Sequence, residues 1–185
     1  TWKLTDGTLT VSGTGEMTDY EGKSGIPWYK YAQNITSIIV ENGVTKIGSM
    51  AFQDCVNATA VSIPASVKVI GKYSFSSCVA LESVVVPEGV ETLGDHAFDR
   101  CLKLVSVSLP KSLRTIGMGA FRACFALSDI TLPYGVKTIS YEAFAECRSL
   151  KSITIPESVT SLGSSVFANC EGLESVTLNC PIPTL

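Results

Sequence analysis

The sequence has little of what metal sites and acid–base catalysis require. Its 185 residues include a single histidine, and its seven cysteines are never spaced as Cys-x2-Cys, the pattern typical of zinc ligands. The seventeen acidic residues are scattered along the chain, and no two of them are placed as an acid–base pair. Gly13-Thr14-Gly15 lacks the third glycine of a dinucleotide-binding loop. We therefore predict no catalytic residues, no metal ligands and no cofactor.

Strong charge and long hydrophobic runs are also missing. A net charge of −3 and a pI near 5.2 leave no basic surface for nucleic acid. The longest apolar runs, such as the one at 84–86, have the length of a strand, so we expect no membrane insertion. The chain begins at Thr1 with no visible signal peptide, and we interpret it as a mature protein or fragment without its targeting segment.

One pattern dominates the residues that are present. A phenylalanine and, three residues later, a cysteine recur every 23 residues, six times. These pairs are Phe52/Cys55, Phe75/Cys78, Phe98/Cys101, Phe121/Cys124, Phe144/Cys147 and Phe167/Cys170. A fixed period of this size is the signature of a solenoid, in which each repeat forms one coil stacked on the last. Equivalent residues then form columns along the stack.

Each repeat contains an alternating segment, as in Ser83–Val86, which predicts a strand with one face inward. A proline follows in most repeats, as at Pro87, and ends the strand because it lacks a ladder donor. Two further apolar residues spaced by three, such as Val90 and Leu93, predict a second inward-facing stretch. The inward strand pairs are Ile38/Val40, Val61/Ile63, Val84/Val86, Val107/Leu109, Ile130/Leu132, Ile153/Ile155 and Val176/Leu178.

A glycine comes next in almost every repeat, as at Gly94, and indicates either positive φ or a close backbone approach. Ser140 replaces it once, which implies negative φ or strain in that coil. Ala97, Phe98 and Cys101 then have helical spacing, so we expect a short helical turn opposite the main strand.

The six periodic cysteines share one column, so pairing all of them would distort its register, and we interpret them as buried free thiols. Cys180 lies outside the column and is the better candidate for a reactive thiol, although a packed residue in a degenerate repeat is the alternative. His96 occupies a variable position beside Tyr73 and Gly119, which offer neither a nucleophile nor an orienting group. We expect it to be a solvated surface residue.

The combined pattern L-x-x-V-x-I-P-x-x-V-x-x-I-G-x-x-A-F-x-x-C resembles the BspA-like class of bacterial leucine-rich repeats. The resemblance implies a right-handed coil of 23-residue repeats, with a parallel sheet on one face and short strands or helical turns on the other. It assigns the repeats to residues 35–178 and a truncated further repeat to 179–185. Residues 1–34 resemble the cap of such arrays, and Asp6-Gly7 is a hairpin signal.

Members of this class are typically secreted or surface-attached bacterial proteins, and some are adhesins. The resemblance therefore implies a non-catalytic, extracellular interaction or adhesion module that binds host or bacterial proteins. A carbohydrate- or cell-wall-binding module and a structural spacer are the alternatives. An aligned row of exposed aromatic residues would favour the carbohydrate-binding alternative, and the sequence shows no clear row of this kind. We also expect the last coil to expose apolar surface, through which the chain could self-associate.

Two regions are candidates for an interaction surface. The outward strand positions are small and mostly hydroxylated, without the Trp, Tyr and Arg that favour binding hot spots. The loops carry larger side chains, and we favour them slightly. They are Tyr73, Arg100, Lys103, Arg114, Arg122, Phe125, Tyr134, Tyr141 and Arg148.

Overall fold

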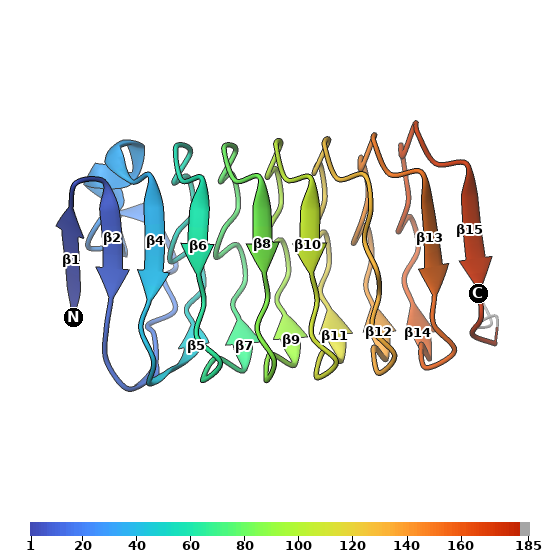
Figure 1. Cartoon of the computed structure of the whole chain (residues 1–185), viewed down its shortest axis with the longest axis horizontal. Helices are drawn as coiled ribbons and strands as arrows, with labels where there is room; N and C mark the ends of the chain where they lie inside the picture. Colours follow the sequence, from blue (N-terminus) through green and yellow to red (C-terminus); the bar gives the residue numbers. More distant parts are fainter. Residues whose placement is uncertain (182–185) are drawn as a thin grey trace.

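The computed structural model describes residues 1–181 and shows a solenoid of stacked coils (Figure 1). Strands of one row lie side by side along the front of the stack, and a second row of shorter strands lies behind them. Partners in consecutive coils are 23 residues apart, as Ser83 and Ser106 are, so the predicted solenoid and its period are confirmed. No helix within residues 1–181 is long and apolar enough to cross a bilayer.

The front strands form three separate sheets. One has the order β1-β2-β4-β6, the second pairs β8 with β10, and the third pairs β13 with β15. Apart from the β1–β2 hairpin, all these pairs are parallel. The strands are β1 (Trp2–Thr5), β2 (Thr8–Val11), β4 (Ser37–Val40), β6 (Ala60–Ser62), β8 (Ser83–Val85), β10 (Ser106–Ser108), β13 (Ser152–Ile155) and β15 (Ser175–Leu178).

The second row is one continuous parallel sheet of seven short strands. Their inward residues, such as Ile70 and Leu93, are fully buried against the front strands. The strands are β3 (Gly15–Glu16), β5 (Val44–Ile47), β7 (Val69–Ile70), β9 (Thr92–Leu93), β11 (Thr115–Ile116), β12 (Thr138–Ile139) and β14 (Ser161–Leu162). Two short 3-10 helices, η1 (Lys23–Gly25) and η2 (Tyr29–Asn34), precede β4.

The Ala-Phe-x-x-Cys segment is a run of turns, so the predicted helical turn is wrong. Alternate amides donate to the carbonyl three residues back, as Cys55 does to Phe52 at 3.3 Å. The amides between them donate to the next coil, as Phe52 does to Ser74 at 2.8 Å. Positive φ at Met50 and Asp54, both 61°, turns the intervening peptide groups toward that coil. A helix would keep these bonds within one coil, whereas the turns use half of them for stacking.

The glycine column exists because neighbouring backbones approach closely. A Cβ added at Gly71 would lie 2.5 Å from the carbonyl oxygen of Ile47, and one at Gly94 would lie 2.8 Å from the carbonyl carbon of Gly71. None of the column glycines has positive φ, and neither does Ser140. Of the two explanations for Ser140, negative φ is therefore the correct one.

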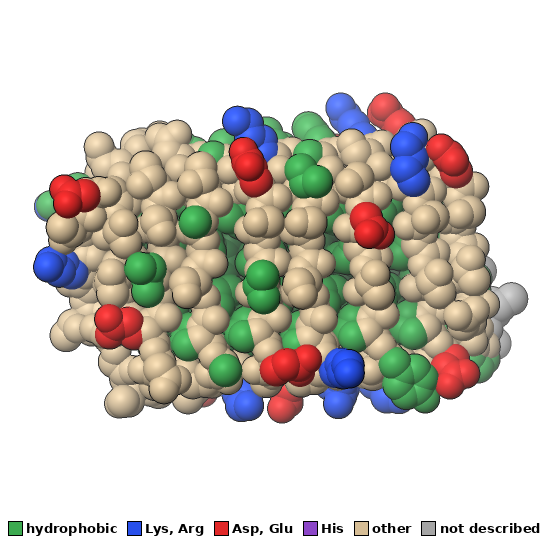
Figure 2. Space-filling view, viewed as in Figure 1, with side chains coloured by type: hydrophobic (Ala, Val, Ile, Leu, Met, Phe, Trp, Pro, Cys, Tyr) green, Lys and Arg blue, Asp and Glu red, His purple; other side chains and the backbone are tan. Residues whose placement is uncertain are grey.

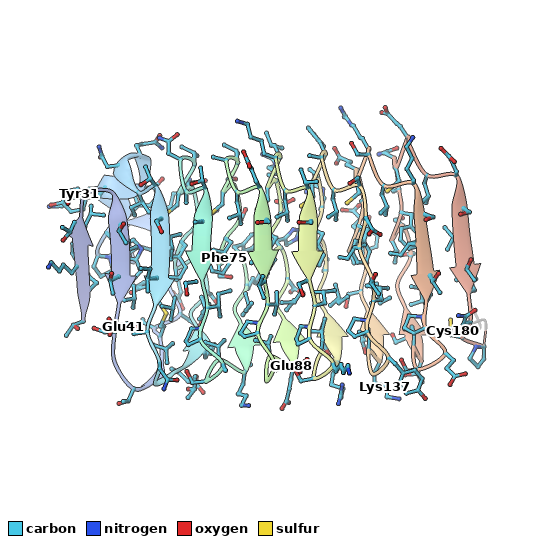
Figure 3. The ribbon with its side chains drawn as sticks, in the orientation of Figure 1. Tyr31, Glu41, Phe75, Glu88, Lys137 and Cys180 are labelled. Atoms are coloured by element: carbon cyan, nitrogen blue, oxygen red, sulfur yellow. The ribbon has the colours of Figure 1, made fainter. Side chains whose placement is uncertain are left out.

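The core of the stack is a spine of parallel aromatic rings. Successive phenylalanine rings lie 5.2–6.0 Å apart between centroids, and Trp28 continues the spine 5.8 Å from Phe52. Phe75 lies inside the coil between the front and second strands (Figure 3). Each column cysteine from Cys78 onward donates its S–H to a phenylalanine carbonyl 26 residues earlier, as Cys101 does to Phe75 at 3.3 Å.

A second hydrogen-bond motif recurs every 46 residues and joins coils in pairs. The Ser112 hydroxyl accepts from the amide of Gly89 at 2.9 Å and donates to the carbonyl of Val90 at 2.8 Å. The same arrangement links Ser66 with Gly43 and Ser158 with Gly135. Alternate coils therefore carry glycine or serine at this corner, so two coils make one structural unit.

The segment predicted as a cap also supplies strands to both rows, since β1 and β2 belong to the front row and β3 belongs to the second row. Asp6 and Gly7, with φ of 48° and 77°, form the turn between β1 and β2. Strand β2 then pairs in parallel with β4, and β3 pairs with β5, so this segment contributes a first coil. Its residues Leu9 and Trp28 are buried.

At the other end, β15 is exposed along its whole length, including its inward residues Val176 and Leu178. This agrees with the expected apolar surface on the last coil. Cys180 is buried at this end (Figure 3), so the interpretation as a packed residue is correct and that as an exposed thiol is wrong. The predicted truncated repeat at 179–185 lies partly outside the described residues.

We predict that Phe98→Ala lowers the free energy of unfolding by about 3–5 kcal/mol, because it removes one ring from the middle of the spine. Phe125→Ala is the matched control, since Phe125 is the one phenylalanine outside the column and only half-buried. It should cost about 1 kcal/mol, the order of its contact with the Arg148 guanidinium 4.3 Å away. Urea denaturation followed by circular dichroism measures both, and equal losses would contradict the role of the spine.

Candidate functional surface

The front face contains a broad groove between the middle coils. Its volume is about 960 Å³, and it runs from β8 across β10 to residues 128–134. Figure 2 shows this face: apolar side chains are visible in depth at its centre, and charged side chains gather along its upper and lower margins. Two other recesses, one at the N-terminal coil and one beside β13, are smaller, at about 270 Å³ each.

The groove exists because the front sheet is interrupted. Strands β8 and β10 pair with each other, β13 pairs with β15, and the coil between them contributes only a single bridge from Asp129 to Ser106. A smaller cavity of about 270 Å³ separates the same coil from β13. The backbone at 128–131 therefore lacks a regular ladder to either neighbour, apart from this bridge and a hydrogen bond of 3.4 Å from the Ser128 amide to the Val105 carbonyl, and the inward side chains of Val107 and Ile130 form the floor of the groove.

The walls combine exposed apolar groups with polar ones. Val85 is 67% exposed in a ladder otherwise rich in Ser and Thr, and Val105 is exposed at the opposite end of the neighbouring strand, where its amide donates to the Glu82 carbonyl. Tyr134, 69% exposed, closes the lower end of the groove next to Lys111. Asp129 is the one carboxylate among the outward positions of the front strands. The surface thus has an apolar centre with one charge of each sign at its margin.

The loop residues predicted as an interaction surface do not form one surface. The structure places them in three regions, and Tyr134 is the only one that lines the groove. Phe125 and Arg148 pack together at one corner, where Lys103 occupies the equivalent loop of an earlier coil. Tyr73, Arg100, Arg122 and Tyr141 belong to the turn segments, and Arg114 follows the lower corner.

Several of these side chains are also engaged within the chain. The Arg122 guanidinium lies 3.7 Å from the carboxylate of Glu142 and 3.5 Å from that of Glu146. Arg148 contacts Glu171 at 3.8 Å as well as the Phe125 ring. Neutralised and packed groups of this kind are less available to a partner than the exposed groups of the groove.

His96 is only 9% exposed, so the prediction of a solvated histidine is wrong. Its ring stacks on Tyr73 with centroids 4.7 Å apart and planes 3° from parallel. Gly119 in the next coil makes room for it, since a Cβ there would lie 2.6 Å from the ring. The neighbour that the sequence argument missed is Asp99, whose carboxylate lies 4.0 Å from Nδ1.

The His96–Asp99 pair is buried and incompletely satisfied. Within the described residues, His96 Nδ1 and Asp99 Oδ1 have no hydrogen-bond partner. Burial raises the pKa of the Asp99 carboxyl, although Arg122, His96 and Arg100 oppose that shift. The pair has no nucleophile within hydrogen-bond distance, and nowhere in residues 1–181 do three His, Cys, Asp or Glu side chains gather as a possible metal site.

The buried thiols of the cysteine column are also unsuited to nucleophilic chemistry. All seven cysteines are free, and the column members from Cys55 to Cys147 are buried. Burial raises the pKa of Cys55 to about 12 and moves those of the inner column members further in the same direction. Because the thiolate is the reactive form, these side chains act as core groups with weak S–H donors.

Comparison with known proteins bears directly on this repeat geometry. The family model described as BspA type leucine rich repeat region matches in six copies, over residues 27–124 and 68–185. The chain belongs to this family. Family members are leucine-rich repeat proteins of the bacterial surface type, and such repeats are generally not enzymes. None of the curated proteins compared with the chain matches it.

The fold is shared with a solved bacterial leucine-rich repeat protein. The T. pallidum leucine-rich repeat protein is 28% identical, with a TM-score of 0.73 over 94% of this chain and 87% of its own. A leucine-rich repeat protein from Bacteroides ovatus is 25% identical, with a TM-score of 0.49 over 97% of this chain and 70% of its own. A leucine-rich cell surface protein from Faecalibacterium prausnitzii is 20% identical, with a TM-score of 0.48 over 80% and 61%.

We predict that Asp99→Asn stabilises the protein by about 1 kcal/mol at neutral pH, because it removes a charge that burial disfavours. The pKa of Asp99 is higher in the folded protein than in the unfolded chain, so deprotonation of this carboxyl destabilises the fold. This destabilisation is absent below the unfolded-state pKa and reaches its full size once the pH has risen through the folded-state pKa. The stability difference should therefore disappear in acid. Urea titrations from pH 3 to 8 measure it, with the exposed Asp129→Asn as control, and a pH-independent difference would contradict the assignment.

Proposed function

We propose that this chain is a non-catalytic, extracellular interaction module of a bacterial surface or secreted protein, and that the groove on its front face contacts a partner protein. The groove is the observation that carries the proposal. It joins exposed Val85, Val105 and Tyr134 across three consecutive coils, while the other outward strand positions are mostly hydroxylated.

The composition of the groove suits a protein ligand. Binding energy in protein interfaces concentrates in a few aromatic and apolar anchors surrounded by polar groups that exclude water. Tyr134 and the two valines supply the anchors, and the Ser and Thr hydroxyls of the strands supply the polar surround. With Lys111 and Asp129 both at the margin, the groove has no strong preference for one sign of charge.

The membership of the BspA-type family supports the surface location, and the absence of an acid–base or nucleophile constellation in the described residues supports a non-enzymatic role. A structural spacer remains the competing function, because a solenoid of rigid coils also holds other domains apart. The two differ in one measurable property, since a spacer has no ligand for its front face.

The test is a binding screen of the chain against purified extracellular-matrix proteins and bacterial surface proteins by biolayer interferometry. For any protein that binds, we predict that Val85→Glu and Tyr134→Ala each weaken the affinity by about tenfold or more, as loss of a central anchor does. Both side chains are exposed, so neither change should alter the fold.

Ile39→Glu is the matched control, because Ile39 occupies the same outward ladder position as Val85 but lies outside the groove. The affinity of the Ile39→Glu protein for the partner should be the same as that of the wild type. Binding that survives both groove substitutions would place the contact elsewhere, and the failure of every protein in the screen to bind would favour the spacer.

A further inference from the structure

The N-terminal coil holds a cluster of aromatic rings that the sequence does not reveal. Trp2 in β1, Tyr20 before η1 and Trp28 before η2 are far apart in the chain, but the fold brings them together. The Trp2 ring lies 6.0 Å from that of Trp28 at 66°, and the Tyr20 ring lies 6.2 Å from it at 85°. Trp28 is buried, and Trp2 is 38% exposed.

These rings line an open cleft of about 270 Å³. Trp28 ends the aromatic spine of the core, stacked on Phe52 at 5.8 Å, and its Nε1 donates to the carbonyl of Ala51 at 2.7 Å. That support holds Trp28 in place, while Trp2 and Tyr20 stand at steep angles to it on the outer side. The result is a recess with aromatic walls that opens to solvent.

The rest of the cleft is polar. Hydroxyls of Thr14 and Thr18 and the carboxylate of Glu16 line it. Backbone groups are accessible at Gly13 and Gly15, where an added Cβ would meet no atom within 4 Å. Glu16 is exposed and only loosely paired, 3.7 Å from the Lys46 ammonium, which has a closer partner in Asp19 at 2.6 Å.

We propose that this cleft binds a single neutral sugar ring, a site separate from the front groove. A pyranose has an apolar C–H face that packs on an aromatic ring and hydroxyls around its edge that need donors and acceptors. Trp2 supplies the ring, while Glu16, Thr14, Thr18 and the glycine backbone supply the polar groups. The cleft is slightly below the range of about 300–1,000 Å³ typical of drug-sized ligands, which suits one ring.

A quaternary ammonium group is the other ligand that aromatic walls attract. The Lys46 ammonium beside Glu16 offsets the negative charge that would favour such a cation. The row of hydroxyls and open backbone also has no role in binding a methylated cation. The polar half of the cleft therefore favours a hydroxylated, uncharged ligand.

The chain reports on this site by itself, because its two tryptophans are Trp2 and Trp28 and both line the cleft. We predict that titration with glucose, galactose or N-acetylglucosamine produces a saturable change in tryptophan fluorescence for at least one of them. The dissociation constant should be on the order of 1 mM, as a small open cleft with few contacts implies. Choline chloride should produce no saturable change.

Trp2→Ala should weaken the affinity for the sugar that produced the fluorescence change by about tenfold or more, and Trp28 remains as the fluorescent reporter. Glu16→Gln changes an exposed side chain without risk to folding, and it should also weaken binding. Tyr141→Ala, an exposed tyrosine outside the cleft, is the control and should leave the affinity unchanged. Melting followed by circular dichroism checks that Trp2→Ala is folded.

Three results would overturn the proposal. These are the absence of a saturable change with all three sugars, equal affinity in wild type, Trp2→Ala and Glu16→Gln, or saturable binding of choline in place of sugar. None of these results bears on the front groove, because Val85 and Tyr134 lie at the middle coils.

Discussion

Stacking in register is the constraint on which the whole structure depends. Each coil must present the same shape to its neighbours every 23 residues, because ring lies on ring, each thiol donates to the carbonyl of an earlier coil, and a Cβ added at a column glycine would lie less than 3 Å from the neighbouring backbone. Even the turn segments give half of their amides to the next coil. Little of this stability belongs to a single coil, so the array is held together by its neighbours.

The parts that the sequence predicts well are those that repeat. The Phe98 column and the strand ended by Pro87 follow from the spacing, whereas the spacing leaves positive φ and close approach as alternatives at Gly94, and the structure shows the close approach. Prediction fails where spacing is ambiguous. The Ala-Phe-x-x-Cys spacing fits a helix, yet positive φ at residues four apart, such as Met50 and Asp54, turns alternate amides toward the next coil, and no residue type signals this beforehand.

The candidate sites could not be read from the sequence for a related reason. His96 is buried only because Gly119 in the following coil leaves room and Tyr73 stacks beneath it. Residues 128–131 look like any other front strand, and the loss of pairing that opens the groove has no local signature. Val85 and Asp129 were the available signals, since both break a ladder of hydroxyl groups. The candidate surfaces thus arise where individual residues depart from the repeat.

The most direct test of stacking in register is a pair of internal deletions. Removal of residues 104–126, one complete period, places Leu127 where Leu104 stood and restores the phenylalanine, cysteine and strand columns, although it removes the hydrogen bonds of Ser112 with Gly89 and Val90. Removal of residues 107–126 deletes three residues fewer than a complete period, so every later column is displaced by three positions. We predict that the first protein keeps the circular dichroism spectrum of the parent and unfolds cooperatively, whereas the second does not fold. If both deletions unfold the chain to the same degree, register between coils is not what holds this structure together.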